Sequence, residues 1–169
     1  MESRRGAEEE KAICRAFVFA YDQRFGRRVT KVRRGTPPEP DFVCDNGIGI
    51  EVTTVYEGQD MAKWRNAPGQ PAISPMAFNP IESMHSELVR LIEQKSGKTY
   101  TACAELFLVL WAKAVFSRHE VWEEVQKTLC LKSAGPFTSV WAGCSKDNGY
   151  VFFSLFGPRG LHPAKIEYP

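Results

Sequence analysis

The chain has 169 residues, of which 43% are hydrophobic and 25% are charged, and its 22 basic and 20 acidic residues give a net charge of +2. These proportions are typical of a globular protein, and they exclude a collagen-like, fibrous or wholly disordered chain. The length predicts a single domain over residues 1–169. No apolar run approaches the roughly 20 residues that span a bilayer, and the charged start is unlike a signal peptide, so we expect a cytoplasmic protein without a membrane partner.

Cysteine usage indicates neither a disulfide framework nor a zinc site. The five cysteines are odd in number and never spaced as Cys-x-x-Cys. Because most of them stand beside apolar residues, we interpret them as reduced cysteines packed in the core.

The first half of the chain predicts a helix followed by three strands. Apolar residues at spacings of one, three and four predict a helix over 8–25, and β-branched residues predict a strand over 27–34. Residues 41–55 predict two strands joined by a tight turn at Asn46-Gly47, since both residue types accept a positive φ. The Pro- and Gly-containing segment 57–79 predicts a long loop, and such loops are often functional.

The second half predicts further helices and strands in alternation. We expect helices over 80–96 and 120–131, and strands over 104–111, 137–144 and 150–156, with a turn at 146–149 between the last two strands. The whole order predicts an α/β fold with a central mixed β-sheet flanked by α-helices.

Two carboxylates are predicted to meet at one edge of this sheet. Asp41 follows Pro40 at the start of one strand, and Glu51 lies on the adjacent antiparallel strand with its side chain on the same side as Thr53. Two carboxylates and the intervening carbonyl of Val52 suit a hard cation such as Mg²⁺ or Mn²⁺. Like charges this close are costly unless a cation or a proton neutralises them.

The order Pro40-Asp41, nine residues, then Glu51-Val52-Thr53 resembles the signature of the PD-(D/E)XK nuclease superfamily, which has the fold of restriction endonucleases. The element order matches from about residue 8 to 156. The resemblance implies a restriction endonuclease-like core, αβββαβ, followed by a C-terminal helix and hairpin. It also implies a Mg²⁺-dependent endonuclease, a hydrolase of DNA phosphodiester bonds, in which Asp41, Glu51 and Val52 bind the metal.

The family also carries an acidic residue on its first helix and a lysine two residues after the second acid. Glu9 fits the first position, with Glu8 and Glu10 as alternatives. Thr53 occupies the second position, and its hydroxyl cannot supply a positive charge but could hold water or phosphate.

In this superfamily the lysine can move to a neighbouring helix, and Lys95 would then supply the charge. Lys95 lies on the apolar face of its predicted helix, one turn after Leu91, and Tyr100 is expected to line the same cleft. The alternative is that Lys95 extends past the core into solvent.

Basic residues are concentrated just before Asp41. A stretch without acidic residues contains Arg24, Arg27, Arg28, Lys31, Arg33 and Arg34. Such a cluster can neutralise phosphates, so we predict that its members from Arg27 to Arg34 contact nucleic acid. Lys63 and Arg65, which flank Trp64 on the long loop, are predicted to add further contacts. The alternative is a solvated surface offset by the acids of the first helix.

A second function class stays open at this point. The chain could be a catalytically inactive nuclease-like module that binds nucleic acid or another protein, and the replacement of the family lysine by Thr53 favours this alternative. The sequence does not decide whether the nucleic acid is DNA or RNA, nor which sequence or structure is recognised. It also leaves the oligomeric state open, with a homodimer as one possibility.

Overall fold

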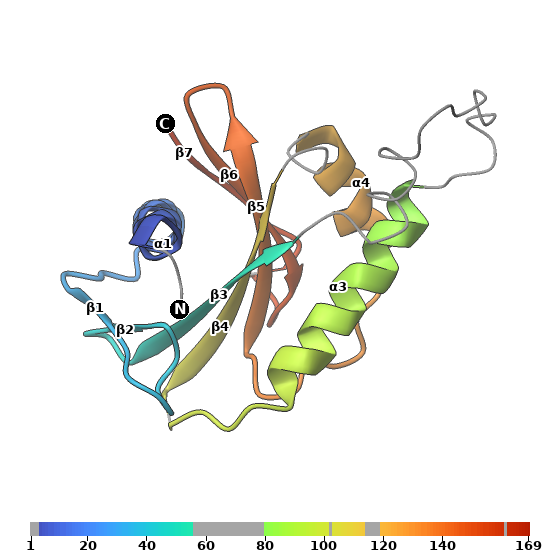
Figure 1. Cartoon of the computed structure of the whole chain (residues 1–169). Helices are drawn as coiled ribbons and strands as arrows, with labels where there is room; N and C mark the ends of the chain where they lie inside the picture. Colours follow the sequence, from blue (N-terminus) through green and yellow to red (C-terminus); the bar gives the residue numbers. More distant parts are fainter. Residues whose placement is uncertain (1–3, 56–79, 102, 114–118, 161) are drawn as a thin grey trace.

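The computed structural model describes residues 4–55, 80–101, 103–113, 119–160 and 162–169. These residues form three helices and one seven-stranded sheet (Figure 1). In chain order the elements are α1 (Arg4–Phe25), β1 (Val32–Arg34), β2 (Phe42–Cys44), β3 (Ile48–Val55), α3 (Pro80–Ser96), β4 (Glu105–Ala112), α4 (His119–Thr128), β5 (Ser139–Lys146), β6 (Gly149–Phe156) and β7 (Lys165–Tyr168). The predicted α/β class is confirmed, whereas the predicted loop 57–79 lies outside the described residues.

The strand order in the sheet is the order in the chain, from β1 to β7. The pairs β1–β2 and β2–β3 are antiparallel, β3–β4 and β4–β5 are parallel, and β5–β6 and β6–β7 are antiparallel. Parallel neighbours need crossover connections, and these are almost always right-handed. Because both crossovers advance across the sheet in the same direction, α3 and α4 cover one face and α1 covers the other (Figure 1).

Strand alternation divides the core into two layers. On the α1 face, Phe17 and Tyr21 pack against Ile50, Val52 and other residues of the central strands. On the opposite face, the residues that contact α3 and α4 include alternate positions of β4, namely Leu106, Leu108, Leu110 and Ala112. The central strand β4 is therefore buried on both sides, as parallel strands usually are. No helix among the described residues is long and apolar enough to cross a membrane.

The strand predicted over 27–34 was too long. Only Val32–Arg34 pairs with β2, because β2 itself is three residues long. Before it, the main chain at Thr30 donates to the Asp45 carboxylate, 3.1 Å, instead of to a neighbouring strand. The helix predicted over 120–131 was also too long, since α4 ends at Thr128.

The sequence did not predict β7. Its four residues follow a Gly- and Pro-containing segment, and they pair with β6 through Tyr150↔Tyr168 and the three pairs that follow. Only Ile166 among them is buried, so the alternation of apolar and polar residues is too short to predict a strand from the sequence. The C-terminal hairpin expected from the sequence is therefore a three-stranded antiparallel unit.

Candidate functional site

The β2–β3 hairpin brings Asp41 and Glu51 together at one edge of the sheet. The ladder pairs Phe42 with Ile50, so Asp41, one residue before β2, comes opposite Glu51. Two hydrogen bonds fix this arrangement: the Val52 N–H donates to Oδ2 of Asp41, 2.9 Å, and the Asp41 N–H donates to Oε2 of Glu51, 3.3 Å. The sequence-predicted juxtaposition of the two carboxylates is confirmed.

Two glycines allow the hairpin to adopt this geometry. Gly47 has a φ of +85° in the turn, a conformation that side chains other than glycine rarely adopt. Gly49 faces Pro40, and a Cβ on Gly49 would lie 2.7 Å from Cγ of Pro40 and 2.7 Å from Sγ of Cys103. The missing side chain at Gly49 thus lets Pro40 lie against β3, which places Asp41 beside Glu51.

Lys95 reaches this pair from the end of α3. Its Nζ lies 2.8 Å from Oε1 of Glu51, and both side chains are shielded, with Glu51 only 3% exposed. Strand alternation explains the contact, because Glu51 projects toward α3 while Ile50 and Val52 project toward α1. Of the two readings of Lys95, the structure therefore supports the one in which it enters the cleft.

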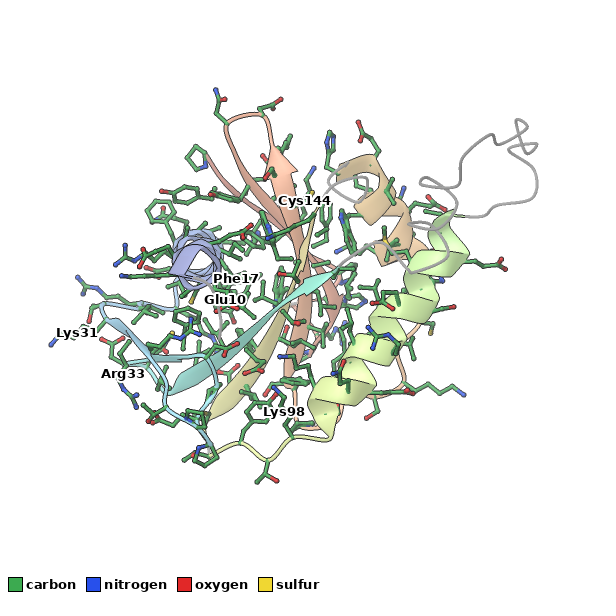
Figure 2. The ribbon with its side chains drawn as sticks, viewed as in Figure 1. Glu10, Phe17, Lys31, Arg33, Lys98 and Cys144 are labelled. Atoms are coloured by element: carbon green, nitrogen blue, oxygen red, sulfur yellow. The ribbon has the colours of Figure 1, made fainter. Side chains whose placement is uncertain are left out.

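A second cation that the sequence did not single out meets the same carboxylate. Lys98 lies beyond the end of α3 and places its Nζ 3.4 Å from Oε1 of Glu51 (Figure 2). It follows Gly97, where helical periodicity has ended, so no regular spacing connected it to the site. Tyr100, expected to line the cleft, lies near both carboxylates, and burial followed by the charges of Glu51 and Asp41 raises its pKa. Its hydroxyl also donates to the carbonyl of Lys95, 3.3 Å, near the end of the helix.

The cluster perturbs the ionisation of its members. Burial, followed by the charge of Glu51, raises the pKa of Asp41 to about 6, against an ordinary value of 3.8. Burial alone would lower the pKa of Lys95, but its hydrogen bond to Glu51 and the nearby carboxylates raise it overall. Lys95 is therefore a stable cation, whereas Asp41 is an acid that a second positive charge would ionise fully.

These groups line a cavity of about 300 Å³, here called the acidic cavity. Its lining residues are Glu10, Asp41, Glu51, Val52, Thr53, Thr54, Lys95 and Lys98.

Of the three glutamates considered on α1, Glu10 and not Glu9 lines the acidic cavity. Glu9 does not line the acidic cavity and instead pairs with Lys113, 2.6 Å. Glu10, one of the two alternatives, faces the cavity and pairs with Arg34, 2.8 Å. Helical phase explains the correction, because successive residues are rotated by about 100° and only one of them can face the β2–β3 edge.

The donor chemistry of the acidic cavity suits a hard divalent cation. Asp41 and Glu51 supply carboxylate oxygens, and the raised pKa of Asp41 reflects an electrostatic cost that a cation would relieve. In an extended strand the N–H and C=O of a residue point to the same side, so the Val52 carbonyl faces the edge where its N–H meets Asp41. No group of three or more His, Cys, Asp or Glu side chains among the described residues is arranged as a ready metal site, so a cation here would rely on two carboxylates and this carbonyl.

The basic cluster is more neutralised than its sequence indicated. Arg27 pairs with Glu105, Arg33 forms a two-pronged pair with Glu39, 2.5 and 2.8 Å, and Arg34 pairs with Glu10. Figure 2 shows Lys31 and Arg33 at the outer edge of the sheet beside β1.

Arg28 and Lys31 are exposed and form no ion pair with any part of the chain that the structure describes. We expected the whole cluster to be available to phosphates, but only Arg28 and Lys31 of the cluster from Arg27 to Arg34 are exposed without an ion pair to the described residues. Lys63, Trp64 and Arg65 lie outside the described residues.

Comparison of the chain with protein-family models, with curated proteins and with solved structures finds no match. The assignment of a function therefore depends on the geometry of the site.

Proposed function

We propose that this protein is a Mg²⁺- or Mn²⁺-dependent nuclease that hydrolyses phosphodiester bonds of DNA in the acidic cavity. The observation that carries the proposal is the convergence of Asp41, Glu51 and Lys95, which come from a hairpin and a separate helix. Lys95 of α3 supplies the positive charge that Thr53 cannot supply. The order of α1, the three antiparallel strands, α3 and the parallel strand β4 supports a restriction endonuclease-like core.

The roles of the residues follow from their chemistry. Asp41, Glu51 and the Val52 carbonyl would hold the metal ion, which when bound supplies a Lewis acid and lowers the pKa of a bound water. Lys95 is a fixed cation within the cavity and is suited to stabilise negative charge on a phosphate oxygen. The Thr53 hydroxyl, which can both donate and accept, is suited to orient a water molecule.

Cationic side chains near the acidic cavity support a polyanionic substrate. A neighbouring cavity of about 440 Å³ lies between α1 and the β1–β2 edge, and it is lined by Lys11, Arg15 and Arg34 against one acid, Glu8. Arg34 connects the two cavities through its ion pair with Glu10. A phosphate backbone crossing this edge would meet positive charge on the way to the two carboxylates.

The proposal is tested by cleavage of end-labelled single-stranded and duplex DNA with Mg²⁺, Mn²⁺ or EDTA. We expect metal-dependent cleavage by the wild type and a loss of at least about 100-fold in Glu51→Gln and Lys95→Met. The matched control is Glu93→Gln, which removes an exposed carboxylate from α3 and should cleave like the wild type.

The inactive nucleic-acid-binding or protein-interaction module is the alternative outcome of the same experiment. Cleavage that persists in EDTA, or that is equal in the wild type and Glu51→Gln, would contradict the proposed site. Metal-dependent DNA binding without cleavage by any variant would favour the inactive module.

A further inference from the structure

A second cavity of about 380 Å³ lies on the α1 face of the sheet, here called the aromatic cavity. It is formed between α1 and the carboxyl ends of β4 and β5, and it is lined by Glu9, Ala12, Ile13, Trp111, Ala112, Lys113, Ser145 and Tyr150. Its volume is at the lower end of the range for small-molecule sites, roughly 300–1,000 Å³, which suits a ligand of the size of a nucleoside.

One wall of the aromatic cavity is made of flat rings. Trp111 and Tyr150 contact each other with ring centroids 5.3 Å apart, and the row continues to Tyr168, 5.9 Å from Tyr150. Trp111 is 5% exposed and forms the floor, whereas Tyr150 is only half-buried and offers more of its ring. Rings of this kind stack on nucleobases irrespective of their sequence, because every base has a π-face.

The mouth of the aromatic cavity supplies hydrogen-bonding groups of both kinds. Glu9 provides acceptors, Lys113 provides donors, and the exposed hydroxyl of Ser145 provides either. Glu9 and Lys113 pair at 2.6 Å, with exposures of 42% and 37%, and ion pairs this exposed contribute little to stability. The pair can therefore separate to bind a ligand whose edge carries both donors and acceptors, as the edges of nucleobases do.

The aromatic cavity adjoins the acidic cavity. Thr54, which lines the acidic cavity, is the register partner of Trp111 on the neighbouring strand, about 4.8 Å away across a sheet. Glu9 and Glu10 are consecutive residues of α1 that face the aromatic and the acidic cavity respectively. The two cavities therefore adjoin at Glu10 and Thr54, whereas Glu51 enters the acidic cavity from the α3 face. The aromatic cavity itself lies at the carboxyl ends of the parallel strands β4 and β5, where α/β sheets commonly bind ligands.

We infer that the aromatic cavity binds one unstacked nucleobase, by stacking on Tyr150 and by hydrogen bonding to Glu9, Lys113 and Ser145. Binding of a base in this position does not require cleavage. Its use in holding a base next to the scissile phosphate rests on the proposed function, and it implies a preference for single-stranded over duplex nucleic acid, since a paired base cannot enter.

The base-binding step is tested by calorimetric titration of the full chain with AMP, GMP, CMP and UMP, and with ribose 5-phosphate as the probe that lacks a base. We expect binding of at least one mononucleotide and none of ribose 5-phosphate at the same concentrations. Tyr150→Ala should weaken mononucleotide binding roughly 5- to 150-fold, and Tyr150→Phe should restore it. The matched control is Phe25→Ala, which shortens another half-buried aromatic of the α1 face and should bind like the wild type.

A second variant keeps the test informative if Tyr150→Ala does not fold. Ser145→Trp introduces a ring from an exposed position, which should fill the aromatic cavity without removing any core contact, and it should also abolish binding. Equal affinity for ribose 5-phosphate and the mononucleotides, or unchanged affinity in both Tyr150→Ala and Ser145→Trp, would overturn the inference.

Two further measurements distinguish a free nucleotide from a nucleic-acid strand as the ligand. They also distinguish failure of the base site from failure of the proposed nuclease function. A single-stranded oligonucleotide that binds more tightly than the mononucleotides and than its duplex supports a strand as the ligand, whereas equal affinity of mononucleotide and oligonucleotide supports a free nucleotide. Glu51→Gln should bind mononucleotides like the wild type. Mononucleotide binding without any metal-dependent cleavage would retain the base site and reject the nuclease.

Discussion

Asp41 is the residue on which the chemistry of the acidic cavity depends most. Its carboxylate is partly buried, is anchored by the Val52 N–H and faces the charge of Glu51, and these surroundings raise its pKa to about 6. Folding therefore favours the protonated form of this side chain relative to the unfolded chain, in which the pKa is near 3.8. A divalent cation would have to displace this proton at pH values below about 6.

The first prediction concerns the pH dependence of stability. The contribution of Asp41 is fully present below its unfolded pKa and is lost as the pH rises through about 6. Asp41→Asn, which keeps an acceptor for the Val52 N–H, should therefore gain stability relative to the wild type as the pH rises from about 4 to about 6. Its advantage should then stay constant up to about pH 8, at about 1–2 kcal/mol without metal. Urea denaturation at a series of pH values measures the difference.

The control for this prediction is Asp147→Asn in the exposed β5–β6 turn, which should track the wild type at every pH. A difference between Asp41→Asn and the wild type that does not change with pH would contradict the raised pKa.

At the scale of elements, the end of α3 and the β2–β3 hairpin make the site together. The hairpin supplies both carboxylates, and the last turn of α3 supplies Lys95, a cation that is 14% exposed and neutralises Glu51. Lys98 meets the same oxygen from beyond the helix end, but its side chain is 52% exposed. Burial rather than proximity alone should decide how much each lysine stabilises the fold, because solvent screens the exposed pair.

The second prediction compares these two lysines. Lys95→Met removes the shielded partner of a carboxylate that is only 3% exposed, and it should lower the free energy of unfolding by about 2–4 kcal/mol. Lys98→Met removes a solvent-exposed partner of the same oxygen and should cost less than about 1 kcal/mol. Chemical denaturation at pH 7 without metal gives both values, and equal costs would contradict the assigned burial of the Lys95–Glu51 pair.

At the scale of the whole molecule, charge is distributed unevenly around the sheet. The basic residues before Asp41 lie at the β1 edge, where acids from α1, the 36–39 turn and β4 neutralise three of them. Arg28 and Lys31 remain exposed without an ion pair inside the described part of the chain. A phosphate contact by such a residue releases counterions, whereas a residue already paired to an acid gains less from it.

The third prediction follows from this difference. If nucleic acid binds at the β1 edge, the double variant Arg28→Gln, Lys31→Gln should flatten the slope of log affinity against log salt by up to about 1.8 units. The double variant Arg27→Gln, Arg33→Gln removes the same charge from paired residues and should flatten it less. Fluorescence anisotropy with labelled DNA from 50 to 300 mM salt measures the slopes; equal changes in both variants would show that the ion pairs do not protect Arg27 and Arg33 from phosphate.

Local patterns were sufficient to predict much of this architecture. The Asn46-Gly47 turn and the alternation of β3 together predicted that Asp41 and Glu51 would meet, because the register of a short hairpin is set within about fifteen residues. The apolar face of α3 placed Lys95 on the side of the helix that meets the sheet, but it left open whether the side chain enters the cleft or extends into solvent. Local patterns could not predict the pairing of β7 with β6, because a four-residue strand is specified by its partner rather than by its own sequence.

The contacts of several charged residues also could not be predicted from local sequence patterns. Glu9 and Glu10 differ only in helical phase, so the choice between them depends on where α1 crosses the sheet. The partners of the arginines come from distant parts of the chain, such as Glu105 for Arg27, so the spacing of residues in the sequence does not predict them. Lys98 joins the site only because the chain turns after α3. These contacts are tertiary, and they decide which charges are available to a ligand.

The central claim is that Asp41 and Glu51 form a divalent-cation site, and calorimetric titration with Mn²⁺ at pH 7.5 tests it most directly. We predict one site per chain in the wild type, a loss of that site in Asp41→Asn and in Glu51→Gln, and its retention in Asp147→Asn. Below pH 6 the apparent affinity of the wild type should fall about tenfold per pH unit, because the cation competes with the proton on Asp41. Mn²⁺ binding of equal affinity in the wild type, Asp41→Asn and Glu51→Gln would contradict the account.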